Sequence, residues 1–474
     1  MTTRQWLIII LLCGAQFMLA LDFSILSVSL PVIGKDLGFA LNDLQWVVTA
    51  FALPSGGFLL LFGRTADLYG RRRWFIAGMA LFTAASLFAG LATAPWMLLV
   101  GRALQGFAGA MLTPAAMSLL TTSFEEGPQR DRALGINGAL LSFGFLCGVV
   151  LGGVITQALN WRFTLFINVP LGVAAVIAAP LLIKESRNAQ APRLDVPGAV
   201  AVTGGLLAII YGVTSAERLG WGSPTMLLIL AAGVLLLAAF LLIESRAAAP
   251  LVDLRVLRRR TVSWGNLTGL ITFSMMTAMV FLLTLYLQRV RGFSPLATGF
   301  CFAALGVAAV TGGAFAAKIV GRLGVPRTLV FGLLLQAVST GALFLLGLDS
   351  GLALFLVATA AAGFGHLLAV VGYMITATSG LPNEEQGLAT GLAYTAQQVG
   401  LTVGTPVLST VAAARIAALG ATGTAAGSIL GGVHAGLLVD AAVLLAGVVI
   451  AVLFLRQRSA PVAAEPAEAS PAAR

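Results

Sequence analysis

Charged side chains are scarce in this chain. Of its 474 residues, 10% are Asp, Glu, Lys or Arg and 59% are hydrophobic, and the mean hydropathy is +0.98. A soluble globule of this length needs far more polar surface, so the composition excludes that class. We therefore expect an integral protein of the cell membrane, with the lipid bilayer as its surroundings.

Cysteine and histidine are also rare. The three cysteines lie inside apolar runs, and the chain has two histidines. This pattern predicts neither a disulfide framework nor a metal site, and no nucleophile–base pair can be assembled, so we expect no enzyme. A glycine-rich phosphate loop followed by Lys and Ser or Thr is also missing, so we expect no ATP site and no cofactor.

Basic residues outnumber acidic ones, 28 to 18, and give a net charge of +10. They are dispersed among short loops and form no basic domain, so nucleic acid is not an expected partner. When the apolar runs are threaded alternately through a bilayer, most of the basic residues fall on one side. The positive-inside rule then places both termini in the cytoplasm.

Apolar runs long enough to cross a bilayer, about 20 residues each, recur along the whole chain. They predict an all-α membrane protein with fourteen spans. The runs fall near residues 6–31, 44–62, 74–93, 96–120, 133–158, 163–183, 197–215, 224–243, 262–287, 296–317, 327–347, 351–375, 387–412 and 432–455.

A short internal repeat in the sequence indicates that the protein consists of two related halves. The segment 318–327 resembles the loop 63–73, with Gly324 in the place of Gly70. Internal repeats are typical of secondary transporters. We predict an N-terminal six-helix bundle, two additional spans with cytoplasmic linkers, a C-terminal six-helix bundle and a disordered tail, at residues 1–187, 188–260, 261–458 and 459–474.

The loop 63–73 concentrates charged side chains between two apolar runs, with four arginines and one carboxylate in eleven residues. Gly63, Asp67, Gly70 and Arg71 suit a cytoplasmic gate, because the glycines allow close backbone approach and the charges can form and break a pair. The arginines could equally serve only to hold the loop inside. Both interpretations remain open at this point.

Asp22 interrupts the first span and Arg102 the fourth. Counting at 1.5 Å per residue puts both in the outer half of the bilayer, at matching depth. A carboxylate inside the membrane is costly and therefore a functional hypothesis. We expect the two to pair and to couple a proton to helix position, although a pair that merely locks two helices is the alternative.

Four glycines at close spacing mark the fifth span: Gly144, Gly148, Gly152 and Gly153. Such a seam lets another helix approach closely. It is either plain packing or a sliding surface between the halves.

Other polar residues fall at helical spacing inside spans. We expect Gln105 in the fourth span and Tyr394 and Gln398 in the thirteenth to line a substrate cavity, with interhelical contacts as the alternative. Asp440 and His366 are further ionisable candidates of lower rank.

Together these segments resemble a known family. The loop 63–73 resembles the signature between helices 2 and 3 of the major facilitator superfamily, and residues 98–110 resemble its helix-4 motif. The segment around Asp22, the glycines 144–153 and the segment 161–172 are similar to motifs of its fourteen-helix drug:proton antiporter branch.

This resemblance implies alternating access by two bundles around a central cavity. It also implies roles in the cytoplasmic gate for Asp67 and Arg71, in proton coupling for Asp22 and Arg102, and in a helix bend for Gly148 and Gly152. The family usually has proline where this chain has Val149, which leaves the bend to the glycines.

We expect a monomer that exports amphipathic or cationic small molecules, such as antibiotics or dyes, in exchange for protons. The alternative is uptake of a nutrient or metabolite by proton symport with the same fold. A membrane-embedded enzyme lacks its catalytic constellation, and a channel lacks a recognisable filter.

Overall fold

The computed structural model is helical throughout the residues it describes, which are 1–39, 43–124, 128–186, 195–220, 222–247, 252–379, 381, 383–420 and 424–455. The expected tail, 459–474, lies outside these residues. The helices are α1 (Thr3–Leu37), α2 (Gln45–Gly57), α3 (Leu59–Tyr69), α4 (Arg71–Gly90), α5 (Pro95–Ser123), α6 (Pro128–Ala158), α7 (Phe163–Phe166), α8 (Asn168–Leu182), α9 (Val196–Leu219), α10 (Pro224–Glu244), α11 (Leu254–Leu257), α12 (Arg260–Leu285), α13 (Pro295–Leu323), α14 (Val325–Ala342), α15 (Leu352–Thr378), α16 (Asn383–Gly420) and α17 (Ala425–Phe454).

Within the part of the chain that the structure describes, twelve helices are long and apolar enough to cross a membrane, and two bent pairs, each counted as one span, bring the number to fourteen. One pair is α2 and α3, bent by 49° where Pro54 and two glycines weaken the helix. The other lies within α6, bent by 42° between Phe145 and Val150, a stretch that contains Gly148. The predicted all-α membrane fold with fourteen spans is confirmed.

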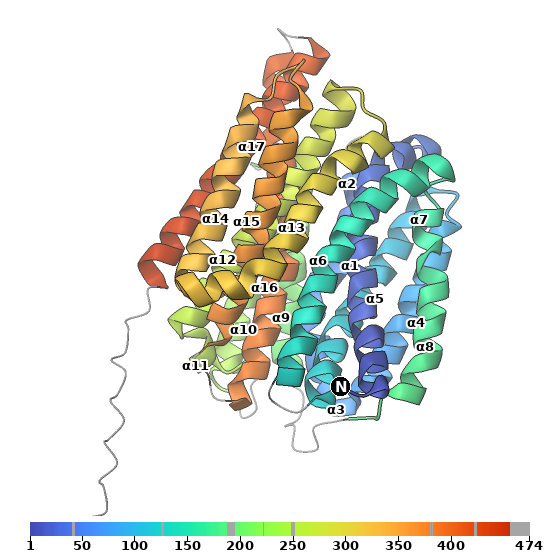
Figure 1. Ribbon diagram of the computed structural model, residues 1–474, viewed down its shortest axis with the longest axis vertical. Helices are drawn as coiled ribbons and strands as arrows, with labels where there is room; N and C mark the ends of the chain where they lie inside the picture. Colours follow the sequence, from blue (N-terminus) through green and yellow to red (C-terminus); the bar gives the residue numbers. More distant parts are fainter. Residues whose placement is uncertain are drawn as a thin grey trace, which may run out of the picture.

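Two helical bundles stand side by side (Figure 1). Helices α1 to α8 form the N-terminal half, and α12 to α17 form the C-terminal half. Helix α12 continues directly into a π-helical turn, η2 (Tyr286–Val290). The N-terminus, α3 and α11 lie at one end of the molecule (Figure 1). We call this the N-terminal end.

The two halves repeat each other in their closest helix contacts. Gly106 of α5 lies against the backbone of Phe51 in α2, and Gly363 of α15 lies in the same way against Leu305 in α13. The loops 63–73 and 318–327 correspond too, because Gly70 and Gly324 both adopt positive φ (117° and 79°) between successive helices. The duplication was expected from one short sequence repeat, and the helix packing of the two halves is repeated as well.

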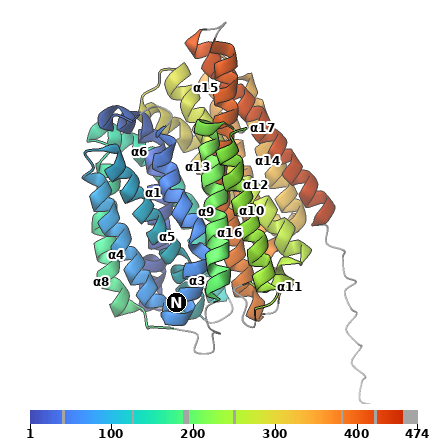
Figure 2. The ribbon, with the colours of Figure 1, turned by 180° about the vertical axis from the view of Figure 1, so that it is seen from behind.

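Of the two inserted spans, α9 packs against both α2 and α16, and α10 packs against α9. Figure 2 shows α9 and α10 beside α16. Gly57 of α2 lies against Leu207 of α9. An apolar cluster joins Phe240 of α10 to Leu60 of α3 and Leu392 of α16. The insertion therefore contacts both halves.

The glycine seam of α6 faces α1. Gly144 and Gly148 lie against the backbone of α1 at Phe17 and Leu21, and Gly152 lies against Ile25. Gly153 instead meets Pro295, at the start of α13 in the other half. Three of the four glycines thus serve packing within the N-terminal half, and one serves contact between the halves.

Gly152→Ala is expected to destabilise the protein by about 1–3 kcal/mol, because the added methyl group meets the Ile25 carbonyl. The control is Gly14→Ala in α1, where the methyl group would enter open space and is expected to be neutral or stabilising. Unfolding of the purified protein in detergent, followed by circular dichroism, measures both. Equal stability of the two variants would contradict this packing.

Candidate functional site

A fully buried ion pair joins α1 to α5. The Oδ2 atom of Asp22 lies 2.5 Å from Nη1 of Arg102, and neither side chain is exposed. The structure therefore brings together the two residues that were expected to pair. In a medium of low polarity such a charge-assisted bond fixes the relative position of its two helices.

The other carboxylate oxygen of Asp22 accepts two more hydrogen bonds. Gln105 Nε2 donates at 3.0 Å and Asn168 Nδ2, from the start of α8, donates at 2.6 Å. On the other side of the pair, Arg102 Nε donates to the Val47 carbonyl at 3.0 Å, and its guanidinium lies 4.5 Å from the centre of the Phe51 ring. The anion is therefore bonded on both oxygens.

Gln105 was expected to line a cavity or to contact a neighbouring helix, and in this arrangement it contacts the ion pair and α4. Its amide is fully buried inside the N-terminal half, where Nε2 also donates to Ser86 Oγ at 2.8 Å. The position of a residue in a polar stripe shows on which face of its helix it lies, but not which part of the protein that face contacts. Asn168 was missed, although it lies in the segment 161–172 that resembles the antiporter branch.

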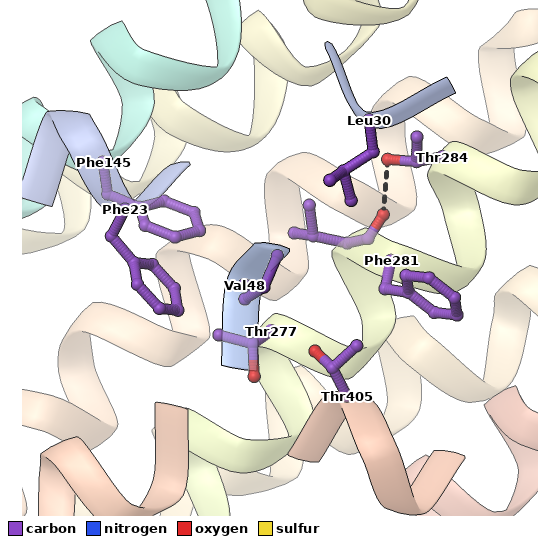
Figure 3. A pocket seen from close by; sticks show the side chains of 9 residues that line it. Phe23, Leu30, Val48, Phe145, Thr277, Phe281, Thr284 and Thr405 are labelled. Atoms are coloured by element: carbon purple, nitrogen blue, oxygen red, sulfur yellow. Dashed lines mark hydrogen bonds between the residues drawn. The ribbon is translucent and has the colours of Figure 1, made fainter. Parts of the chain in front are cut away.

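A small cavity lies between the halves (Figure 3). Its lining comes from α1, α2 and α6 on one side and α12 and α16 on the other. The lining residues are Phe23, Leu30, Val48, Phe145, Thr277, Val280, Phe281, Thr284 and Thr405. The Thr284 hydroxyl donates to the backbone carbonyl of Val280 at 2.8 Å, the dashed line in Figure 3. Among the described residues no charged side chain lines the cavity, and its wall consists of apolar and aromatic side chains and three threonines.

The ion pair does not border this cavity. Phe23 follows Asp22 in α1, and successive residues of a helix point about 100° apart. Asp22 therefore faces the interior of the N-terminal half while Phe23 faces the cavity. The acid can act on the cavity only through movement of α1.

Tyr394 and Gln398 were expected to line a cavity, but neither lines this one. The hydroxyl of Tyr394 accepts from Asn137 Nδ2 at 3.4 Å, and Gln398 Nε2 donates to Ser55 Oγ at 2.9 Å. Both partners belong to the N-terminal half. The polar stripe of α16 thus joins the two halves on the side of the cavity nearer the N-terminal end.

The halves also touch beyond the cavity, toward the opposite end. There Gly153 meets Pro295, and Gln288 Nε2 donates to the Val28 carbonyl at 3.4 Å. Contacts between the halves therefore flank the cavity on both sides.

The segment 63–73 was expected to be a loop, but it is helical except at Gly70, with residues 63–69 at the end of α3 and 71–73 at the start of α4. It forms the expected pair between Asp67 and Arg71, with Nε and Oδ1 2.8 Å apart. Gly70 brings the chain close to Glu185, whose Oε1 accepts from the Arg72 backbone N–H at 3.1 Å. Glu185 was not anticipated. Gly63 lies beside Pro114 of α5. These contacts all lie within the N-terminal half, and the gating role stays a prediction.

A second polar cluster lies at the opposite end. Asp36 Oδ2 accepts from Trp161 Nε1 at 2.8 Å and from Arg162 Nη1 at 2.7 Å. Arg162 Nη2 also donates to the Ala92 carbonyl at 3.0 Å. The hydrogen bonds from Trp161 and then Arg162 hold the pKa of Asp36 below its ordinary value of 3.8. This cluster ties three segments of the N-terminal half together.

The two lower-ranked candidates both lie in the C-terminal half. The His366 Nδ1 atom lies 3.0 Å from the hydroxyl of Thr272, which donates to Gln336 Oε1 at 2.7 Å. Asp440 is fully buried in α17. Among the described residues, no group of His, Cys, Asp or Glu could hold a metal ion.

Arg102→Leu is expected to lower the free energy of unfolding by about 3–5 kcal/mol, because it leaves the Asp22 carboxylate buried without its cation. The double variant Asp22→Asn/Arg102→Leu removes both charges and is expected to recover part of that loss. Denaturation of the wild type, Asp22→Asn, Arg102→Leu and the double variant in detergent gives the coupling energy. If the losses of the two single variants simply added up in the double variant, the expected coupling between Asp22 and Arg102 would be refuted.

The lowered pKa of Asp36 predicts a pH dependence at the opposite end. A carboxylate with a lowered pKa keeps its stabilising contacts above its ordinary pKa and loses them as the pH falls through the lowered value. The contact with Trp161 is therefore expected to persist down to pH 3.8 and to break below it. Tryptophan fluorescence measures this, with Asp36→Asn as the control. The same acid response in that variant would refute the assignment.

Comparison with known proteins agrees with this architecture. The family model for the Major Facilitator Superfamily matches residues 12–405. The puromycin resistance protein of Streptomyces alboniger is 38% identical over 422 residues, which are 88% of this chain and 83% of that protein. The tetracenomycin C resistance and export protein of Streptomyces glaucescens is 34% identical over 415 residues, which are 87% and 77% of the two chains.

The fold is also similar to that of a solved structure. A bacterial homologue of the human lysosomal transporter Spinster, solved in an inward-facing state, superposes with a TM-score of 0.66 at 15% identity. The match covers 97% of this chain and all of that one. With the family model and the two relatives, this shows that the chain belongs to the Major Facilitator Superfamily.

Proposed function

We propose that this protein expels an antibiotic or a similar aromatic, amphipathic compound across the cytoplasmic membrane in exchange for protons. The observation that carries the proposal is the fully buried Asp22–Arg102 pair, in which Asp22 shares helix α1 with Phe23, a residue that lines the cavity between the two halves. The relatives that are named for puromycin resistance and for tetracenomycin C export support the direction of transport.

The cavity lining favours a particular class of substrate. Phe23, Phe145 and Phe281 offer ring faces and edges to aromatic groups. No carboxylate lines the cavity to neutralise a cation, so a positive charge on the substrate would rely on these rings. We therefore favour aromatic compounds with little charge over simple organic cations.

Protonation of Asp22 supplies the coupling in this proposal. A proton converts the carboxylate to a neutral acid and removes the attraction that holds Arg102. The bonds from Gln105 and Asn168 to the same carboxylate weaken as well. Helix α1 is then free to shift against α5 and carries Phe23 with it, which changes the wall of the cavity.

The driving force is the electrochemical gradient of protons, without ATP or another cofactor. Each proton that enters the cell gains about 2.3 kcal/mol per 100 mV of membrane potential. By the positive-inside rule, the arginines of the segment 63–73 support a cytoplasmic location for the N-terminal end, and an even number of spans then puts both termini on that side in this proposal. One chain suffices as the transporting unit, because the cavity and the ion pair lie within it.

Asp22→Asn is expected to abolish both resistance and proton exchange, because the amide cannot take up and release a proton. Everted vesicles from a pump-deficient host are energised so that their lumen becomes acidic, and puromycin or tetracenomycin C is then added. Export predicts release of luminal protons by the wild type, reported by a pH-sensitive dye. The matched control is Asp349→Asn, an exposed carboxylate in a loop, which should behave as the wild type.

Two results would count against the proposal. Proton release that persists in Asp22→Asn would remove Asp22 from the coupling. Absence of release in the wild type, together with proton-driven accumulation of substrate by intact cells, would favour symport.

A further inference from the structure

Asp440 differs from every other acidic group discussed above. It lies near the middle of α17, its side chain is fully buried, and neither carboxylate oxygen has a hydrogen-bond partner among the described residues. Asp22, by contrast, is bonded on both oxygens. A buried acid without partners needs its own explanation.

The depth of Asp440 follows from the contacts of its helix. Gly436 of α17 lies against Leu282 of α12, and Gly447 lies against Leu333 of α14. Ala441 is next to Gly341 of α14. Asp440 is therefore level with the end of α14 near Gly341 and with the part of α12 between Ile271, which Gly447 meets, and Leu282, beside the apolar cluster of the C-terminal half.

No described charge is placed to compensate it. Helix α17 packs against α12, α14, α16 and η2. The titratable or basic residues with described side chains on these elements and on α17 itself are Arg260, Arg327, Arg415, Tyr394, Tyr286, Arg289 and His434. The arginines lie near helix ends, and Tyr394 meets the other half. The hydroxyl of Tyr286 donates to the Gly347 carbonyl, and His434 bonds the Leu346 carbonyl.

The polar groups at the level of Asp440 are engaged elsewhere. Gln336 is bonded to Thr272, and Thr340 donates to the sulfur of Met279 at 3.4 Å. An ionised carboxylate in this position would have neither a counter-ion nor a donor, which is prohibitive at mid-membrane depth. The group must therefore be neutral and carry a proton in this arrangement.

We propose that Asp440 is a second protonation site of the exporter, located in the C-terminal half and loaded in the arrangement seen here. It releases its proton when α17 shifts against α12 and α14 and water reaches the carboxyl group. A purely structural role does not explain Asp440, because leucine would fill the same apolar site without burying a polar group. The inference rests on the proposed function and adds a second proton to it.

The protonation state can be observed without transport. Infrared spectra of the wild type and of Asp440→Asn are recorded at neutral pH and subtracted. The wild type is expected to show the C=O stretch of a neutral carboxylic acid, and Asp440→Asn is expected to lack this band. Should that variant fail to fold, Asp440→Glu replaces it and is expected to shift the band. A spectrum with no such band, or with a band that neither variant alters, overturns the proposal.

The coupling is measured in proteoliposomes as protons moved per substrate molecule. Asp440→Asn is expected to transport with one proton fewer than the wild type, whereas Asp440→Glu keeps the full ratio. An unchanged ratio in Asp440→Asn would show that Asp440 is only structural. If Asp22→Asn also kept the wild-type ratio, the proposed function itself would fail, so the two failures are distinguishable.

Discussion

The pairing of Asp22 with Arg102 is the constraint on which the N-terminal half depends. Two opposite charges without water are tolerated only when their remaining donors and acceptors are bonded. The half supplies such bonds from three other helices, through Val47 on α2, Ser86 on α4 by way of Gln105, and Asn168 on α8, and of the atoms of the pair only Arg102 Nη2 has no hydrogen-bond partner among the described residues. With α1 and α5, five helices therefore meet around the ion pair.

Close packing between α1 and α6 extends the constraint from the ion pair to a second helix. Gly144, Gly148 and Gly152 bring α6 against the backbone of α1, so α1 cannot move without α6. Both helices contribute a phenylalanine to the cavity, Phe23 from α1 and Phe145 from α6. A change at the ion pair is thus transmitted to the cavity wall by rigid helices.

The two halves share their packing but differ in chemistry. Gly106 and Gly363 occupy equivalent positions in the repeated arrangement. Where the N-terminal half has a buried ion pair, the C-terminal half has the hydrogen-bonded group of Thr272, Gln336 and His366, together with the buried acid Asp440. The two halves thus share a helix arrangement and differ in their polar interiors.

The sequence by itself determined the fourteen spans, the duplication and the matching depth of Asp22 and Arg102, because hydropathy and a rise of 1.5 Å per residue are local properties. Only the tertiary structure decided which way each side chain faces. It placed Gln105 within the ion-pair cluster, Tyr394 between the halves and Asn168 on Asp22. The rotation of a helix about its axis is set by its neighbours, and these come from distant parts of the chain.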